Sequence, residues 1–205
     1  MKSATISERP LTTLDVIFGR RSVRSYSKEK LDNATIRGLL DAAVQAPTAM
    51  HAEPWAFVVI QDPHTLKRYS DLAKGIWGQE TINYRDLHVP GDIALEARFV
   101  EQLARPDFCI FYDASTLIVI CGKPLGPFVV ADCWLAAENL MLAACAMGLG
   151  SCCVGSALPA LRTPEAKAEF GIPADVTPIA PIIVGVPAGA EAPVARKDPE
   201  ILYWK

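Results

Sequence analysis

A short basic segment near the start of the chain, RRSVRSY at residues 20–26, has residue types that bind phosphate. Each of its three arginines presents a planar fork of N–H donors to oxygen atoms, and its serines add hydroxyl donors. A solvated basic turn has the same composition. Taken alone, the segment therefore leaves a phosphate-binding loop and an ordinary surface turn both open.

A second segment, APTAMHAEPWAF at residues 46–57, combines small, polar and aromatic residues. Pro47 stops the helix expected before it, and Trp55 begins an apolar run of strand length. The segment is thus a loop between a helix and a buried strand. It could line a ligand, or it could only reverse the chain and leave Trp55 packed in the core.

The glycine-rich stretch GLGSCCVG at residues 148–155 is not a dinucleotide-binding motif. It lacks the GxGxxG spacing, and it follows a helix instead of joining a strand to one. The sequence also has no GxxxxGK[ST] phosphate loop and no GxSxG nucleophile elbow. Its histidines have no metal-ligand spacing with one another or with cysteine, so no metal site is expected.

The composition predicts one globular domain over residues 1–205. A length of 205 residues is enough for one hydrophobic core but tight for two. Of these residues, 51% are hydrophobic and 21% are charged, as is typical of a globular chain. The net charge is −3. This balance argues against nucleic acid as a partner, because proteins that bind a phosphate backbone need a strong basic excess.

The cysteines and the apolar stretches predict a cytoplasmic protein without a membrane partner. The six cysteines contain no CxxC pair and are typical of small buried residues in a reducing compartment. The first ten residues lack the apolar core of a signal peptide. The most apolar stretch, residues 134–155, includes Glu138 and Asn139 and ends in glycines, which favours a buried helix over a membrane span.

Hydrophobic periodicity predicts the elements that must position these segments. We expect helices after Thr12 or Thr13, after an Asp32 or Asn33 cap, and over residues 62–75, 92–104, 129–147 and 159–170. Continuous apolar runs predict buried strands over 55–60, 116–121 and 177–186, with a short strand at 152–154. Residues 75–92 are expected to form a long loop. The order favours an α+β or α/β fold around one mixed sheet.

The last residues, 187–205, are expected to form an extended C-terminal arm rather than a linker. The arm is rich in alanine, proline and glycine at its start and ends in Ile201, Leu202, Tyr203 and Trp204. Those side chains must be buried somewhere, and a second subunit could cover them. The helix at 129–147, apolar nearly all round, also suits a central or shared position.

Five motifs in this order resemble those of the FMN-dependent nitroreductase family. They are RRSVRSY, APTAMHAEPWAF, ENLMLAACAMGLGS at 138–151, PIIVGVP at 181–187 and RKDPEILYWK at 196–205. The resemblance covers nearly the whole chain. It implies an α+β fold, with a mixed central sheet flanked by helices and a C-terminal arm exchanged in a homodimer. It further implies FMN, with NADH or NADPH as electron donor, and hydride transfer through FMN to a small nitro compound, quinone or enone by a ping-pong mechanism.

The resemblance also implies which residues contact the cofactor. The basic loop would hold the FMN phosphate and ribityl chain, and the arm would close on the same phosphate. A loop from the other subunit would line the flavin ring, and the segment after GLGS would face it. The implied residues are, in that order, Arg20, Arg21, Ser22 and Arg24; Arg196 and Lys197; Pro47, Thr48, Ala49 and His51; and Cys153, Val154, Gly155 and Ser156. No catalytic acid is implied.

The sequence departs from the family pattern at two positions. His51 stands where the family usually has Asn, and Glu53 where it usually has Gln. An ionised Glu only accepts hydrogen bonds. Near a flavin it would oppose negative charge on the reduced ring unless it were paired or turned away. The alternative is that Glu53 packs against its own loop or a neighbouring helix N-terminus. Some members place a polar pair on a helix before the second strand; the helix at 92–104 offers Arg98 and Gln102, but the sequence does not assign them.

Two other functions stay open on the sequence. A specialised relative could carry out reductive dehalogenation or destroy flavin, with the loop at 75–92 as a substrate lid. A protein that only binds flavin would be yellow without oxidising NAD(P)H. The physiological substrate and the choice between NADH and NADPH do not follow from the residues.

Overall fold

Four strands form one sheet in the order β1-β2-β4-β3 in the computed structural model, which describes residues 11–79, 98 and 101–205. The strands are β1 (Trp55–Ile60), β2 (Thr116–Gly122), β3 (Gly150–Cys153) and β4 (Thr177–Gly185). All four predicted strands are confirmed. Neighbouring strands are antiparallel throughout, so the prediction of a mixed sheet is wrong for them. Continuous apolar runs report burial on both faces but not strand direction.

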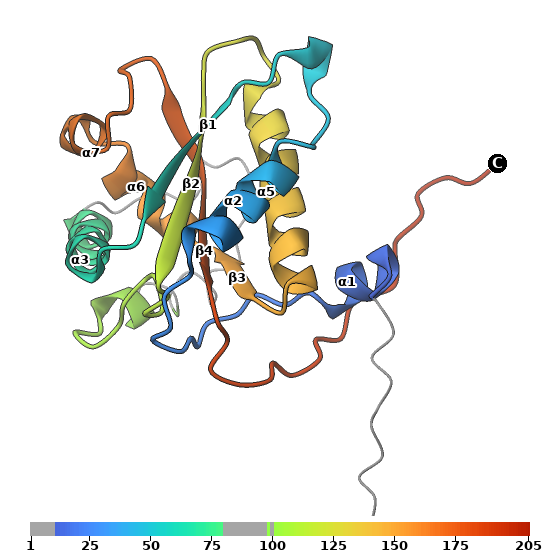
Figure 1. The fold of residues 1–205 in the computed structure, drawn as a ribbon, viewed down its shortest axis with the longest axis horizontal. Helices are drawn as coiled ribbons and strands as arrows, with labels where there is room; N and C mark the ends of the chain where they lie inside the picture. Colours follow the sequence, from blue (N-terminus) through green and yellow to red (C-terminus); the bar gives the residue numbers. More distant parts are fainter. Residues whose placement is uncertain (1–10, 80–97, 99–100) are drawn as a thin grey trace, which may run out of the picture.

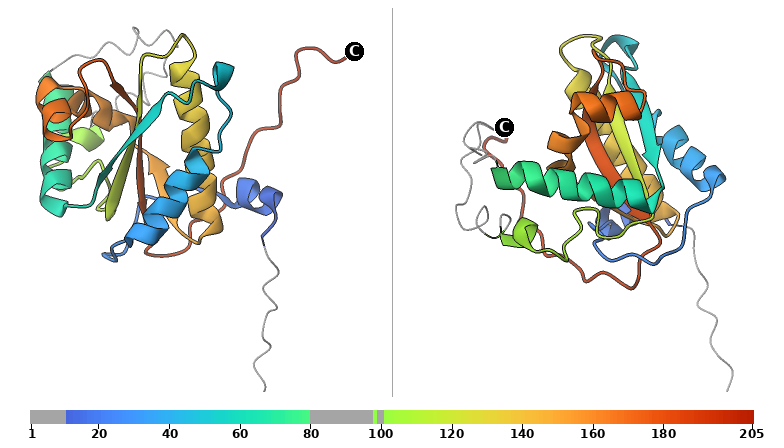
Figure 2. Two further views of the ribbon diagram at one scale, coloured as in Figure 1. Left: turned by 45° about the horizontal axis from the view of Figure 1, so that its top comes forward. Right: turned by 90° about the vertical axis from the view of Figure 1, so that its left-hand side faces the viewer.

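Helices cover both faces of the sheet, and this explains the apolar runs (Figure 1). The helices α2 (Asn33–Ala43) and α5 (Val129–Ala146) lie on one face. The other face carries α3 (Pro63–Gln79), α6 (Leu158–Leu161) and α7 (Pro164–Glu169). Figure 2 shows α2 and α3 on opposite sides of the strands. The architecture is α+β.

Alternate residues of β2 supply the two cores. Leu117 and Val119 pack in the cluster under α3, and Ile118 and Ile120 pack in the cluster under α5. All four side chains are buried. This alternation is the period of two that a strand imposes on its side chains. The sheet thus has a hydrophobic core on each face, and loops lie at the ends of its strands.

Most predicted helices occur where local capping signals place them. Thr12 and Asp15 form a capping box at the start of α1 (Thr13–Gly19), and Asp32 caps α2. The predicted helix at 159–170 is two helices, because Thr163 caps a new helix that starts at Pro164. The helix predicted to stop at Gly75 continues to Gln79, since an isolated glycine only weakens a helix.

Two predictions fall mainly outside the described residues. Of the expected loop at 75–92, residues 75–79 belong to α3 and the rest lies outside the described part of the chain. Of the expected helix at 92–104, residues 98 and 101–104 are helical.

The long apolar helix α5 is the central core helix on its face of the sheet. By length and composition alone it could cross a membrane. Here it contacts α2, β2 and β4, and seven of its residues are buried. The predicted bounds, 129–147, differ by one residue from those observed.

The C-terminal arm leaves the sheet and runs past α1 without folding back (Figure 1). Its first residues are held, since the Ala188 N–H donates to the Ser25 carbonyl at 3.0 Å. Its last apolar residues are exposed, Leu202 to 90% and Trp204 to 83%. Among the residues that the structure describes, none therefore covers these side chains of the arm. The prediction that a second subunit covers them stays a prediction.

Gly150→Ala should destabilise the fold by about 1–3 kcal/mol, the usual cost of overpacking. A Cβ at Gly150 would lie 2.8 Å from the Cβ, Cγ1 and Cγ2 atoms of Val23. Gly75→Ala is the matched control, because a Cβ there meets nothing within 4 Å. The control should be neutral or stabilising by up to about 1 kcal/mol. Urea unfolding of both variants measures the difference, and equal stabilities would contradict it.

Candidate functional site

The basic segment at residues 20–26 is tied by its backbone to the end of the sheet. The Val23 N–H donates to the Ser151 carbonyl at 3.0 Å, and Ser22 and Ser151 form a parallel bridge. Further along, the Ser27 N–H donates to the Val186 carbonyl at 2.8 Å. Close approach is feasible because Gly150 has no side chain opposite Val23. The segment thus has a fixed position relative to β3 and the end of β4.

On one side of this segment lies a cavity of about 530 Å³, called here the Arg24 pocket. Its lining residues come from the basic segment, from the chain between residues 102 and 112, and from β3 and the turn that follows it. They are Arg24, Gln102, Phe108, Ile110, Tyr112, Cys152, Cys153, Val154, Gly155 and Ser156. The pocket thus joins one cation and one amide side chain to an aromatic wall and a stretch of backbone.

Arg24 lies beside the aromatic wall. Its guanidinium carbon is 5.9 Å from the centre of the Tyr112 ring, within the range of a cation–π contact. Tyr112 has a φ of 51°, a left-handed conformation that is costly for a non-glycine residue. Phe108 packs edge-on against the Tyr112 ring with centres 5.4 Å apart. Phe108 thus supports the Tyr112 ring from one side, and the Arg24 guanidinium lies over that ring.

The backbone at residues 154–156 is anchored from both sides. The Val154 N–H donates to the Pro181 carbonyl at 2.9 Å, and the Trp77 indole N–H donates to the Ser156 carbonyl at 2.8 Å. Between these anchors Gly155 is exposed, and a Cβ on it would meet nothing within 4 Å. A ligand could therefore approach the backbone closely at Gly155.

Burial keeps the Cys153 thiol of the Arg24 pocket protonated. It raises the pKa of Cys153 to about 11, with the neighbouring Cys152 adding to the effect and the Gly155 backbone N–H opposing it. At neutral pH the side chain is thus a neutral thiol. Because the thiolate is the nucleophile, the pocket does not carry a cysteine activated for covalent catalysis.

A smaller cavity of about 240 Å³ lies beside Arg20 and Arg21 and the start of the arm. Arg20 Nε is 3.5 Å from Glu138 Oε1 on α5. Arg21 Nη1 donates to the carbonyls of Phe18 at 2.7 Å and Arg20 at 2.8 Å, so it caps the end of α1. Both guanidinium groups thus have intramolecular partners.

The loop at residues 47–54 lies at the other end of α5. The Ala49 N–H donates to Asp132 Oδ1, in the first turn of α5, at 3.2 Å. Met50, His51 and Glu53 all have left-handed φ angles, of 55°, 54° and 44°. Met50 is 95% exposed, and Glu53 is exposed as well. The loop thus projects outward and lies at the opposite end of the molecule from the basic segment (Figure 1).

One chain brings together only part of the predicted site. Arg24, Cys153, Val154, Gly155 and Ser156 share the Arg24 pocket, with Arg20, Arg21 and Ser22 next to it. The loop residues Pro47, Thr48, Ala49 and His51 are at the opposite end of α5, and Arg196 and Lys197 are exposed on the arm. Gln102, which the sequence offered together with Arg98 without assigning either, lines the pocket. The sequence feature that pointed to Gln102 is its place as a polar residue on the helix predicted before β2.

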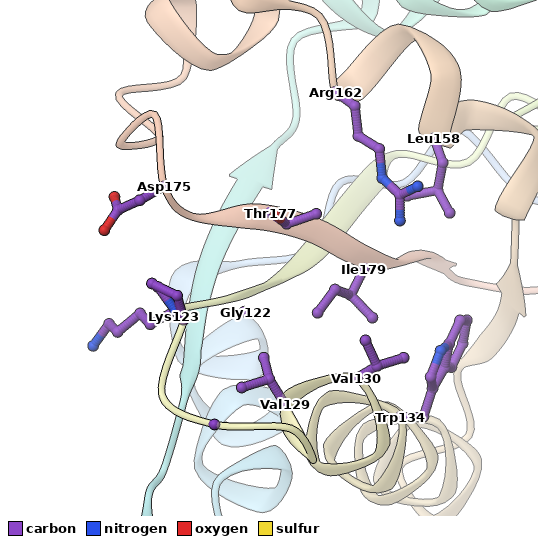
Figure 3. A pocket seen from close by; sticks show the side chains of 12 residues that line it. Gly122, Lys123, Val129, Val130, Trp134, Leu158, Arg162, Asp175, Thr177 and Ile179 are labelled. Carbon is purple, nitrogen blue, oxygen red and sulfur yellow. The ribbon is translucent and has the colours of Figure 1, made fainter.

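A third cavity, of about 290 Å³, lies near the start of α5 (Figure 3). Val130 and Trp134 of α5 line one side and Leu158 of α6 lines another. Arg162 Nε donates to the Pro178 carbonyl at 2.9 Å, which ties this cation to the backbone. None of the predicted cofactor residues lines this cavity.

Comparison with known proteins gives the family and the fold. The nitroreductase family model matches residues 17–186. A protein of Archaeoglobus fulgidus, named "Putative NADH dehydrogenase/NAD(P)H nitroreductase", is 29% identical over 179 residues, covering 85% of this chain and 84% of its own. A protein of the same name from Methanothermobacter thermautotrophicus is 26% identical over 199 residues, covering 94% of this chain and 86% of its own.

Two solved structures share the fold. A nitroreductase with bound FMN from Bacteroides fragilis superposes with a TM-score of 0.75 at 24% identity, over 94% of this chain and 97% of its own. A nitroreductase with bound FMN from Desulfitobacterium hafniense gives a TM-score of 0.77 at 22% identity, over 94% of this chain and 98% of its own. With the family match over residues 17–186, these similarities establish that the chain belongs to the nitroreductase family.

Proposed function

We propose that the chain is an FMN-dependent oxidoreductase that passes a hydride from NADH or NADPH to a small nitro compound, quinone or enone. The observation that carries the proposal is the Arg24 pocket, in which a cation and an amide side chain face an anchored, exposed backbone at Gly155. The named Archaeoglobus relative and the FMN-bound neighbours point the same way.

The residues present fit FMN in their chemistry. Arg20, Arg21 and Ser22 adjoin the Arg24 pocket along one backbone. They offer guanidinium forks and a hydroxyl to a phosphate that carries nearly two negative charges. Charged hydrogen bonds of this kind contribute about 1.5–3 kcal/mol each. The pocket beside them has an apolar and aromatic wall suited to a flat ring.

FMN, when bound, supplies the hydride chemistry, and the chain positions and tunes it. Arg24 and the backbone N–H at Gly155 would stabilise negative charge in the pocket. Donor and acceptor would use this one pocket in turn, which gives ping-pong kinetics. We assign no general acid, because burial raises the pKa of the Cys153 thiol to about 11, which makes it a poor proton donor at neutral pH.

The proposed active form is a homodimer, since one chain leaves the predicted site in separate parts. A second copy would bring its loop at 47–51 to the Arg24 pocket. Apolar side chains are exposed on α1 at Leu14 and Phe18 and on α5 at Val130 and Leu135, and burying them would favour association. All six cysteines are free thiols, which supports a reducing, cytoplasmic location.

The proposed function predicts that the purified protein is yellow and that denaturation releases FMN. Adding NADH or NADPH without oxygen should bleach the flavin. Arg24→Gln should weaken FMN binding about tenfold to a hundredfold, whereas Arg37→Gln, on the exposed surface of α2, should not. A colourless protein that takes up no added FMN would refute the proposal. A yellow protein that neither donor reduces would be a flavin-binding protein without this activity.

The homodimer predicts a mass of twice 22.2 kDa by light scattering at micromolar concentration. Leu202→Glu should shift the protein toward monomer, because Leu202 lies exposed on the arm. Leu72→Glu adds the same charge at an exposed position of α3 and should leave the dimer intact. A stable monomer that holds FMN would contradict the dimer.

If the loop of a second subunit brings an ionised Glu53 close to the flavin ring, Glu53→Gln should raise the reduction potential of the bound flavin by a few tens of millivolts. A unit charge about 6 Å away in an effective dielectric of about 20 interacts by about 2.8 kcal/mol. For a two-electron couple about 1.4 kcal/mol corresponds to about 30 mV, so the upper bound is about 60 mV. The sign follows because Glu53 opposes the negative charge gained on reduction.

Anaerobic titration against a reference dye measures this shift. Glu165→Gln is the control, since that residue is exposed in the first turn of α7 and should leave the potential unchanged. If Glu53→Gln leaves the reduction potential unchanged but lowers the free energy of unfolding, the role of Glu53 is to stabilise its own loop.

A further inference from the structure

A separate cavity of about 600 Å³, called here the lysine pocket, lies where β1 ends and the chain enters β2. It is formed by the loop before α2, the start of α3 and residues 109–115. We propose that it is a second ligand site, for an organic anion with an apolar body. The inference does not depend on the flavin, because no residue lines both this cavity and the Arg24 pocket.

The charge around the lysine pocket favours an anion. Lys28, Lys30 and Lys67 line it, against one carboxylate, Asp113. Lys67 is paired with Asp71 along α3. Within the described part of the chain, neither Lys28 nor Lys30 has an ion pair. With Lys67 paired, Lys28 and Lys30 still outnumber the Asp113 carboxylate, so the lining of the cavity is cationic in a chain of net charge −3.

The inner surface of the lysine pocket favours an apolar body on the ligand. Leu66 and Phe111 line it from the core, with exposed fractions of 6% and 1%. The Ser115 hydroxyl is buried nearby without a hydrogen-bond partner among the described residues. The volume is within the range of about 300–1,000 Å³ common for small-molecule sites. An aromatic carboxylate matches both the cationic rim and the apolar floor.

The segment between the two pockets is a shared wall with two faces. Phe108, Ile110 and Tyr112 line the Arg24 pocket, whereas Cys109, Phe111 and Asp113 line the lysine pocket. Both Tyr112 and Asp113 have left-handed φ angles, of 51° and 56°. Because successive residues face opposite sides, both pockets can be occupied at once.

Calorimetric titration of the FMN-loaded protein, freed of unbound FMN, with 2-naphthoate tests the proposal. We expect one site per chain, weakened at least tenfold in the Lys28→Gln/Lys30→Gln variant. Both lysines are exposed, so these substitutions should leave folding intact. Lys123→Gln removes a lysine that lines the pocket of Figure 3 and should leave the affinity unchanged.

Two further probes separate charge from apolar contact. Naphthalene-2-methanol, which lacks the charge, should bind more weakly and equally to the parent protein and the double lysine variant. Inorganic phosphate should bind more weakly than 2-naphthoate. The proposal fails if 2-naphthoate does not bind, if Lys123→Gln weakens its binding as much as the double variant does, or if phosphate binds as tightly.

Discussion

The backbone contact that covers the outer edge of β3 is the constraint on which the site depends. In the order β1-β2-β4-β3, β3 pairs with β4 on one side only, and its other edge would present unpaired backbone groups. The segment around Val23 covers that edge through the hydrogen bond to the Ser151 carbonyl. Gly150 permits the contact because a Cβ there would collide with Val23. This one contact fixes the backbone of the basic segment, whose Arg20 and Arg21 line the smaller cavity and whose Arg24 lines the Arg24 pocket.

Left-handed backbone occurs in the loop at residues 47–54, which the proposed homodimer would bring to the Arg24 pocket, and in the segment between the Arg24 pocket and the lysine pocket. Met50, His51 and Glu53 adopt it in one loop, and Tyr112 and Asp113 in the other. Such conformations cost about 1–3 kcal/mol each and persist where surrounding contacts hold them. Asp132 holds the first loop through the Ala49 N–H. The second is held by its own turns, in which the Tyr112 N–H donates to the Cys109 carbonyl at 2.9 Å. Binding loops on a rigid scaffold often have this character.

The sequence could predict the elements but not their arrangement. Strands such as β2 follow from continuous apolar runs, and the starts of α1 and α2 from Thr12 and Asp32, because these signals act over a few residues. Strand direction is set by long connections and carries no local signal. Gln102 reaches the Arg24 pocket only through tertiary packing. The separation of the 47–54 loop from the basic segment likewise depends on the length of α5.

The ion pair between Arg20 and Glu138 shows how the basic segment can be ordered and yet ready for an anion. The two atoms are 3.5 Å apart, and the side chains are 21% and 48% exposed. Pairs this accessible contribute only about 0–1 kcal/mol, because water screens them. A phosphate that accepts two parallel guanidinium hydrogen bonds is the stronger partner. Exchanging Glu138 for phosphate would therefore cost little, while the backbone contact at Ser151 keeps the arginine in place. The fold fixes the main chain firmly and leaves the charged side chain free to change partners.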